Sequence, residues 1–257
     1  MKKRTLLLLP LTALIAAPLH SQSEDSEGIF TVTPSFVPVF MNRGARQSDF
    51  SFQPTIEYSK GPLSLELFCN FPISDKIPGA ADPQLDFAAH YTWIIAPNLL
   101  TVKSGVTLST LPRANKDDGI HKATWEPSVC FGYTWNDIDF LLNFYYDITM
   151  KGSTYEFGID YSIPLQHLGF DVELSALVGR CGWSEAEVNA NLKVANNGNY
   201  WQAGVAIPYE FSKKSKLVVG WHYVEGFNNH FYVGGERIPN YDAVGRGVFN
   251  VSFSTRF

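Results

Sequence analysis

The last ten residues, Val248-Phe-Asn-Val-Ser-Phe-Ser-Thr-Arg-Phe257, decide the fold. Phenylalanine and valine alternate in this stretch with asparagine, serine and arginine. A period of two residues indicates a β-strand with one apolar and one polar face. A strand of this kind that ends on an aromatic residue is typical of an outer-membrane β-barrel. We expect this strand, with Phe257 at its end, to engage the barrel-assembly machinery.

The other end of the sequence predicts export. The basic run Met1-Lys-Lys-Arg4 precedes a short apolar stretch that ends near Pro18. This is the pattern of a secretory signal peptide, which we place at residues 1–22. An uncleaved anchor helix is the alternative, but the apolar run is shorter than the roughly 20 residues that a membrane span needs. Residues 23–257 would then form the barrel, in the bacterial outer membrane.

The composition fits a barrel with an apolar outside and a polar inside. Aromatic residues make up 14% of the chain, yet the mean hydropathy is only −0.07. The net charge of −5 argues against a nucleic-acid partner, which requires a basic face. The three cysteines, Cys69, Cys130 and Cys181, lack the spacing of a metal site, and their odd number argues against a disulfide framework. We therefore predict no metal and no other cofactor.

Alternating segments of strand length follow one another along the whole mature chain. Twelve are predicted, at 29–41, 49–58, 62–72, 84–95, 99–109, 122–135, 137–148, 153–163, 168–179, 198–211, 215–226 and 244–257. Their connectors are alternately short and long, as in barrels with short periplasmic turns and long outer loops. The stretch Glu187–Val194 also alternates, so ten or fourteen strands stay open. It could instead begin a helix capped by Ser184; we interpret 180–197 as a long outer loop.

A soluble β-sandwich would show the same alternation. Strand length, the asymmetry of the connectors and aromatic residues near both strand ends favour the membrane barrel. An all-β, closed antiparallel transmembrane barrel is therefore the predicted fold. The apolar parity gives the residues expected to face lipid, which are Leu63, Leu65, Phe140, Leu142, Val172 and Leu174.

The first predicted loop resembles a known family. It reads Asn42-Arg-Gly-Ala-Arg-Gln-Ser-Asp49 and is followed by Gln53-Pro54. This is similar to the first-loop motif of TorF-type porins, in which an Arg-Gly pair and a Gln-Ser pair connect the first two strands. The runs Gly198–Pro208 and Ala243–Gly247 resemble other barrels of this kind. The resemblance implies an outer-membrane barrel with a pore, and it implies no catalytic residues.

The polar face of the strands would line the lumen, and acidic side chains outnumber basic ones there. The residues predicted to line the pore are Glu66, Asp86, Lys103, Glu126, Asp139, Asp160, Asp171, Glu173, His222, Arg246 and Arg256. A tube lined by one sign of charge concentrates the opposite ion. We therefore hypothesise a passive, cation-preferring channel for small solutes, with the three basic residues forming a constriction against the acids. A barrel plugged by its own interior is the alternative.

Other functions stay open. The predicted loops 180–197 and 226–242 carry aromatic residues and could bind an extracellular ligand or mediate adhesion, or fold over the mouth as a lid. An outer-membrane hydrolase would need a nucleophile and a base to meet in space, and His222, Ser128 and Glu126 are the inward candidates. No hydrolase motif accompanies them, so we predict that the protein is not an enzyme. Outer-membrane lipid and small solutes are the expected partners.

Overall fold

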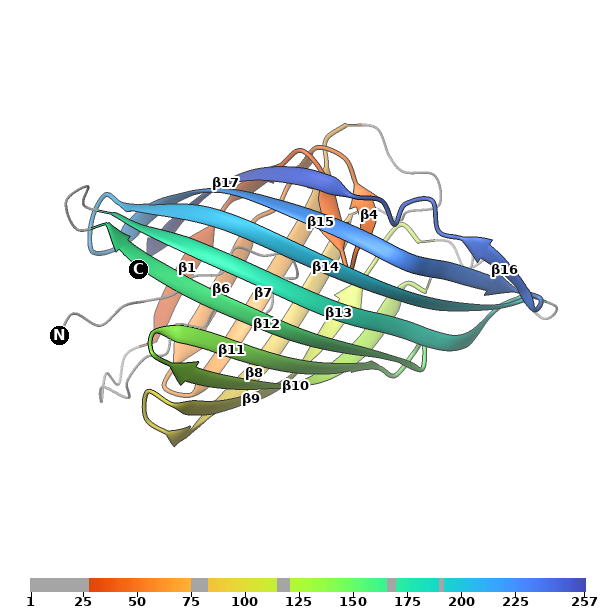
Figure 1. Ribbon diagram of the computed structural model, residues 1–257, viewed down its shortest axis with the longest axis horizontal. Helices are drawn as coiled ribbons and strands as arrows, with labels where there is room; N and C mark the ends of the chain where they lie inside the picture. The colour runs from red at the N-terminus through yellow and green to blue at the C-terminus, as the bar shows by residue number, and fades with distance from the viewer. Residues whose placement is uncertain (1–27, 75–82, 115–120, 166–169, 190–191) are drawn as a thin grey trace.

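The computed structural model is a closed antiparallel β-barrel of twelve strands (Figure 1). It describes residues 28–74, 83–114, 121–165, 170–189 and 192–257, and between 184 and 194 it describes the backbone alone. The predicted signal peptide lies outside the described residues. Among those residues, no helix is long and apolar enough to span a membrane.

The bounds of the strands follow the chain order. They are β1 Ile29–Thr33, β2 Ser35–Val37, β3 Phe40–Asn42, β4 Ala45–Ser48, β5 Ser51–Phe52, β6 Thr55–Lys60, β7 Leu63–Pro72, β8 Gln84–Ala96, β9 Leu100–Thr110, β10 Ala123–Trp135, β11 Ile138–Asp147, β12 Gly152–Leu165, β13 Phe170–Asn189, β14 Leu192–Glu210, β15 Ser215–Val233, β16 Glu236–Pro239 and β17 Arg246–Arg256.

Two strands of the barrel are each divided into two shorter strands by a proline. Pro34 separates β1 from β2, and Pro54 separates β5 from β6. Proline lacks the amide hydrogen that a ladder needs, so the pairing breaks at both positions. The barrel closes where β17 pairs with β15 on one side and with β1 and β2 on the other. Counting each interrupted strand once gives the predicted number of twelve.

The two faces of the wall differ as the alternation predicts. On β11, Leu142 is 54% exposed and its neighbour Asn143 is fully buried. The other residues predicted to face lipid are likewise exposed or half-buried. An apolar belt around a closed barrel with a polar interior is the architecture of an outer-membrane protein. The chain is thus an outer-membrane β-barrel, located in the bacterial outer membrane.

Short turns join the strands at the end of the barrel that carries Phe257, as the connector lengths predict. One of them is Asn136-Asp137, where both residues have positive φ (48° and 65°). Two consecutive residues in this region form the type I′ turn, whose twist matches that of the strands it connects. The closing contact lies at the same end, where the Phe257 amide donates to the carbonyl of Phe30 at 2.9 Å.

The prediction of long outer loops at 180–197 and 226–242 is wrong, because most of these residues belong to strands. Residues 180–189 continue β13 and residues 192–197 belong to β14, and the ladder between them reaches Asn189 and Leu192. Strand β15 runs on to Val233 and pairs with β16. The helix alternative for this stretch is wrong as well. The asparagine-rich sequence looks like a loop, but β14 pairs here with both of its neighbours, and β13 beyond Trp183 pairs with β14. These strands project beyond the rest of the barrel at one end (Figure 1), so they form a raised wall rather than a lid.

The first predicted strand, 29–41, is too long. It leaves the wall after Val37, and β3 and β4 then form a separate two-stranded sheet. Pro38 lies at this departure point and cannot donate to a continued ladder. The β3–β4 hairpin, residues 40–48, is the element around which the functional site is built.

Candidate functional site

The β3–β4 hairpin lies inside the lumen. Its residues contact inward-facing side chains of β7, β10, β11, β14, β15 and β17, which together go around most of the wall. A segment that reaches so many wall strands must cross the interior of the barrel. The hairpin therefore narrows the passage through it.

The tip of the hairpin is a tight turn. Arg43 and Gly44 both have positive φ (49° and 76°), as a type I′ turn requires. A Cβ at Gly44 would lie 2.4 Å from the Cβ of Tyr200 and 2.9 Å from the Cα of Gly226. Glycine is thus required at position 44 for two reasons: the positive φ of the turn and the close approach of the backbone to the wall.

Apolar contacts hold the strands of the hairpin against the wall. Met41 is 1% exposed and packs with Val224 of β15 and Val248 of β17. On the other side, the ring of Phe40 lies 6.0 Å from that of Phe68 on β7. These apolar side chains lie on a face that is largely polar. The hairpin packs on these wall side chains, and the apolar surface buried between them anchors it.

Arg43 extends from the turn to the opposite wall. Its Nη2 donates to Oε1 of Glu126 on β10 at 2.7 Å, and its guanidinium carbon lies 5.2 Å from the ring centre of Tyr145 on β11. Burial alone would lower the pKa of Arg43, but the neighbouring Glu126 carboxylate raises it above its usual value. The side chain therefore keeps its positive charge within the lumen.

Behind this ion pair, Glu156 of β12 is the centre of a buried network. Asn143 Nδ2 and the Tyr145 hydroxyl donate to its Oε2 at 3.1 Å and 3.2 Å, and the Tyr200 hydroxyl donates to its Oε1. All four side chains are at most 3% exposed. Three donors satisfy the charge of Glu156, and the network fixes the ring of Tyr145 beneath Arg43.

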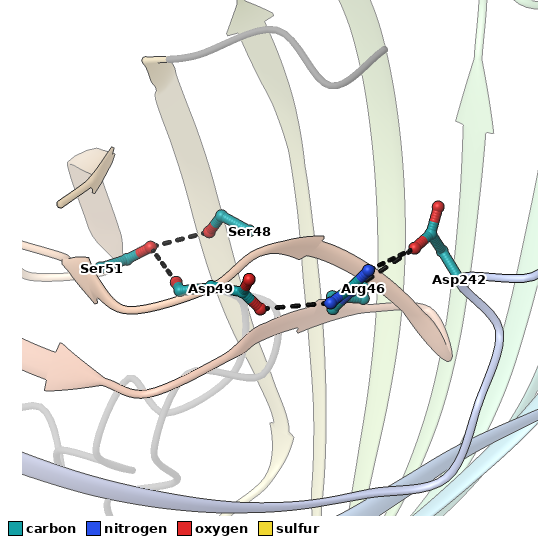
Figure 2. A network of polar contacts seen from close by, with 5 residues as sticks. All are labelled: Arg46, Ser48, Asp49, Ser51 and Asp242. Carbon is teal, nitrogen blue, oxygen red and sulfur yellow. Dashed lines mark hydrogen bonds and ion pairs between the residues drawn. The ribbon is translucent and has the colours of Figure 1, made fainter. Parts of the chain in front are cut away.

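The base of the hairpin is tied to the segment before the last strand. Figure 2 shows Arg46 between Asp49 and Asp242, with nitrogen-to-oxygen distances of 3.4 Å and 3.1 Å. The Arg46 amide also donates to the carbonyl of Asp242 at 2.9 Å. Nearby, the hydroxyls of Ser48 and Ser51 are 2.7 Å apart. Because the carboxylates of Asp49 and Asp242 are about one-third exposed, their ion pairs position the chain more than they stabilise it.

The residues predicted to line the pore have side chains that share the inward parity of the wall. The acids and Lys103 are buried or half-buried, Asp139 faces Asp160 across β11 and β12, and Glu126 contacts the hairpin through Arg43. Arg246 and Arg256 stand at opposite ends of β17. Ten residues of extended strand separate them by about 33 Å, so they face different levels of the lumen.

The structure does not assemble the inward triad candidates. Glu126 pairs with Arg43, and within the described part of the chain the Ser128 hydroxyl has no hydrogen-bond partner and His222 makes no hydrogen bond to either residue. Cys69, Cys130 and Cys181 are free thiols. No group of three or more His, Cys, Asp or Glu side chains among the described residues could hold a metal ion.

Arg43 is absent from the residues predicted to line the pore, although it belongs to the loop motif on which the family resemblance rests. Its signal was present in the Asn42-Arg43-Gly44-Ala45 run, which has the composition of a hairpin turn. The alternation on both sides of this run was consistent with a short hairpin. Whether such a hairpin points outward or into the lumen depends on contacts such as Arg46 with Asp242, 196 residues away, which no local pattern reports.

No protein-family model and no curated protein matches the chain. Among solved structures, it is similar to an outer membrane channel from Pseudomonas putida F1, with 12% identity and a TM-score of 0.48 over 93% of this chain and 100% of that chain. LpxR from Salmonella typhimurium gives 9% identity and a TM-score of 0.48 over 88% and 99%. Omp33 from Acinetobacter baumannii gives 11% identity and a TM-score of 0.41 over 90% and 98%. At these identities the likeness concerns the fold alone, and the resemblance to TorF-type porins rests on its motifs.

Proposed function

We propose that the protein is a passive outer-membrane channel for small solutes, constricted by the β3–β4 hairpin. The observation that carries this proposal is the Arg43–Glu126 ion pair, which joins the hairpin tip to the far wall. A hairpin held inside a polar lumen, with a charged contact at its tip, is suited to limit the size and charge of what passes. The same hairpin argues against an unobstructed, wide pore.

The proposed channel prefers cations. Glu66, Asp86, Asp139, Asp160, Asp171 and Glu173 are among the acids whose side chains share the inward parity of the wall. Arg43 is neutralised by Glu126, so it adds no net charge at the hairpin tip. A lumen with a surplus of carboxylates raises the local concentration of cations and lowers that of anions.

Planar-bilayer recording of the refolded protein tests the channel. We expect discrete single-channel openings, and a reversal potential in a KCl gradient that reports potassium permeating faster than chloride. Folded protein that inserts but gives no openings would refute the channel. Equal permeation of both ions would refute the cation preference and leave the channel standing.

A matched pair of glycine substitutions tests the role of the hairpin. Gly44→Ala places a methyl group against Tyr200 and should unseat the hairpin tip, which we expect to raise the conductance. Gly61→Ala is the control, because Gly61 also has positive φ (56°) but lies in a turn with no atom within 4 Å of the added carbon. If both variants conduct like the wild type, the hairpin is not the constriction.

A second candidate is a non-conducting barrel whose outer surface binds a ligand or mediates adhesion. The observation in its favour is the raised wall of β13–β16, near which Phe227, Tyr232 and Tyr241 are 44%, 37% and 81% exposed. A silent barrel in the recordings above would favour this function. Removal of the three aromatic side chains would then be expected to abolish adhesion to host or partner cells without affecting folding.

A further inference from the structure

The seat of the Arg43 side chain has the chemistry of a binding site for a guanidinium or ammonium group. The Glu126 carboxylate accepts a hydrogen bond from Nη2 at 2.7 Å, and the ring of Tyr145 lies beneath the guanidinium carbon at 5.2 Å. A carboxylate beside an aromatic face is how proteins recognise organic cations. In this structure a side chain of the same protein occupies that seat.

The surroundings favour a positive charge beyond the one that Arg43 supplies. Asp86 of β8, Asp147 of β11 and Glu156 of β12 all lie near enough to interact electrostatically with Arg43. With Glu126, four acidic side chains therefore act on one guanidinium. Withdrawal of the hairpin removes the guanidinium that offsets these acids, so the site then favours a cation from solution.

Arg43 fills the seat incompletely. Within the described residues, its Nε is buried without a hydrogen-bond partner, as is Oδ1 of the adjacent Asn42. On the wall, Oδ1 of Asn143 also lacks a partner although the residue is fully buried and its amide group points at Glu156. Buried polar atoms without partners weaken the contact that leaves them so. A free guanidinium has as many N–H donors as the Arg43 side chain, but it is not held by the hairpin and can turn them toward the partners that Arg43 leaves unmatched.

We propose that the Glu126–Tyr145 seat is a solute-binding site of the lumen for small organic cations bearing a guanidinium or primary ammonium group, and that Arg43 is its tethered internal occupant. Such a solute enters by exchange, taking the place of Arg43 on Glu126 while the hairpin tip withdraws. No covalent step is involved. That such cations are transported rests on the proposed channel function. That they bind at the Glu126–Tyr145 seat does not depend on it.

Calorimetric titration of the refolded full-length protein in detergent micelles tests the site, with methylguanidinium as the probe. We expect Arg43→Ala to bind the probe saturably and at least about tenfold more tightly than the wild type, because the tethered side chain competes at a high effective concentration. The double variant Arg43→Ala/Glu126→Gln should lose the binding. Methylurea, which has a similar shape and no charge, should bind to none of the three proteins.

Two controls keep the result interpretable. Folding of each variant is checked by its heat-dependent migration in electrophoresis, and Arg43→Gln replaces Arg43→Ala if the latter does not fold. No binding to a folded Arg43 variant, or binding that survives Glu126→Gln, would overturn the site. A barrel that binds methylguanidinium but never conducts would refute the channel alone. A conducting barrel that does not bind the probe would refute the site alone.

Discussion

Arg43 has the largest predicted effect of any single residue on ion selectivity. It is the guanidinium that faces Glu126 at the hairpin tip, amid the carboxylates of Asp86, Asp147 and Glu156. Removal of its charge in Arg43→Gln leaves the surrounding acids uncompensated. We expect the ratio of potassium to chloride permeability to rise several-fold, as measured by reversal potentials in a KCl gradient.

Lys213→Gln is the matched control for this change. It removes the same charge from an exposed turn at the opposite end of the barrel. At ordinary salt, exposed charges act over only about 10 Å, so this variant should keep the selectivity of the wild type. Equal shifts in both variants would mean that net charge, and not the position of Arg43, sets the selectivity.

Glu156 is the residue on which the stability of the lumen network depends most. In Glu156→Leu, the buried donors of Asn143, Tyr145 and Tyr200 lose their acceptor. A buried donor left without a partner costs about 1–3 kcal/mol, so we expect the free energy of unfolding to fall by at least about 2 kcal/mol. Tryptophan fluorescence during denaturant unfolding in micelles measures it. Glu156→Gln keeps an acceptor and should cost less; equal losses would contradict the role of the hydrogen bonds.

Among the elements, β11 offers a clear test of the membrane-facing surface. Leu142 lies at the middle of the strand on its outer face and is 54% exposed, and Ile138 lies on the same face at the end of the strand. We expect Leu142→Arg to cost about 2–4 kcal/mol and Ile138→Arg about 0–1 kcal/mol in lipid vesicles. Unfolding in vesicles of the two variants side by side measures the difference. Equal costs would mean that β11 does not cross the membrane at the predicted depth.

The regular elements could be predicted from the sequence because their signal is local. Each wall strand repeats the same two-residue period, and turn residues such as Asn136 mark where a strand ends. The length of β13 and β14 could not be predicted, since the alternation of Glu187–Val194 is short and the same residues also fit a loop or the start of a helix. Their pairing is set by the neighbouring strand, which only the assembled sheet supplies.

The candidate site could be predicted only in part, for the same reason. Parity identifies Glu126 as inward, because its strand neighbours alternate with it. The partner of Glu126 comes from a hairpin 83 residues earlier in the chain, and Arg43 looks like an ordinary turn residue there. The sequence pattern records which face a wall residue takes. It does not record which loop fills the space between the walls.

At the scale of the whole molecule, we expect Phe257 to affect assembly into the outer membrane but not the stability of the folded barrel. Its side chain is 70% exposed, so Phe257→Ala should change the free energy of unfolding of the refolded barrel by no more than about 0.5 kcal/mol. We expect the same substitution to lower the amount of folded protein in the outer membrane of cells several-fold, because the assembly machinery is proposed to recognise this residue. Quantitative blots of membrane fractions measure it.

Phe211→Ala is the matched control, since Phe211 is an aromatic residue in a turn at the same end of the barrel and is 57% exposed. It should leave both the stability and the amount in the membrane unchanged. If the two variants reach the outer membrane equally well, the machinery does not depend on the terminal aromatic residue.

The seat of the hairpin also dictates an order of events during folding. Met41 packs on Val224 and Val248, and Arg46 pairs with Asp242, which is 196 residues away. These partners come into place only when β15 and β17 have joined the start of the chain. Closing such long loops is slow, so the hairpin reaches all of its contacts only after the ring of strands is complete. A newly closed barrel would thus be open for a time, and its narrowing would be the last step of its maturation.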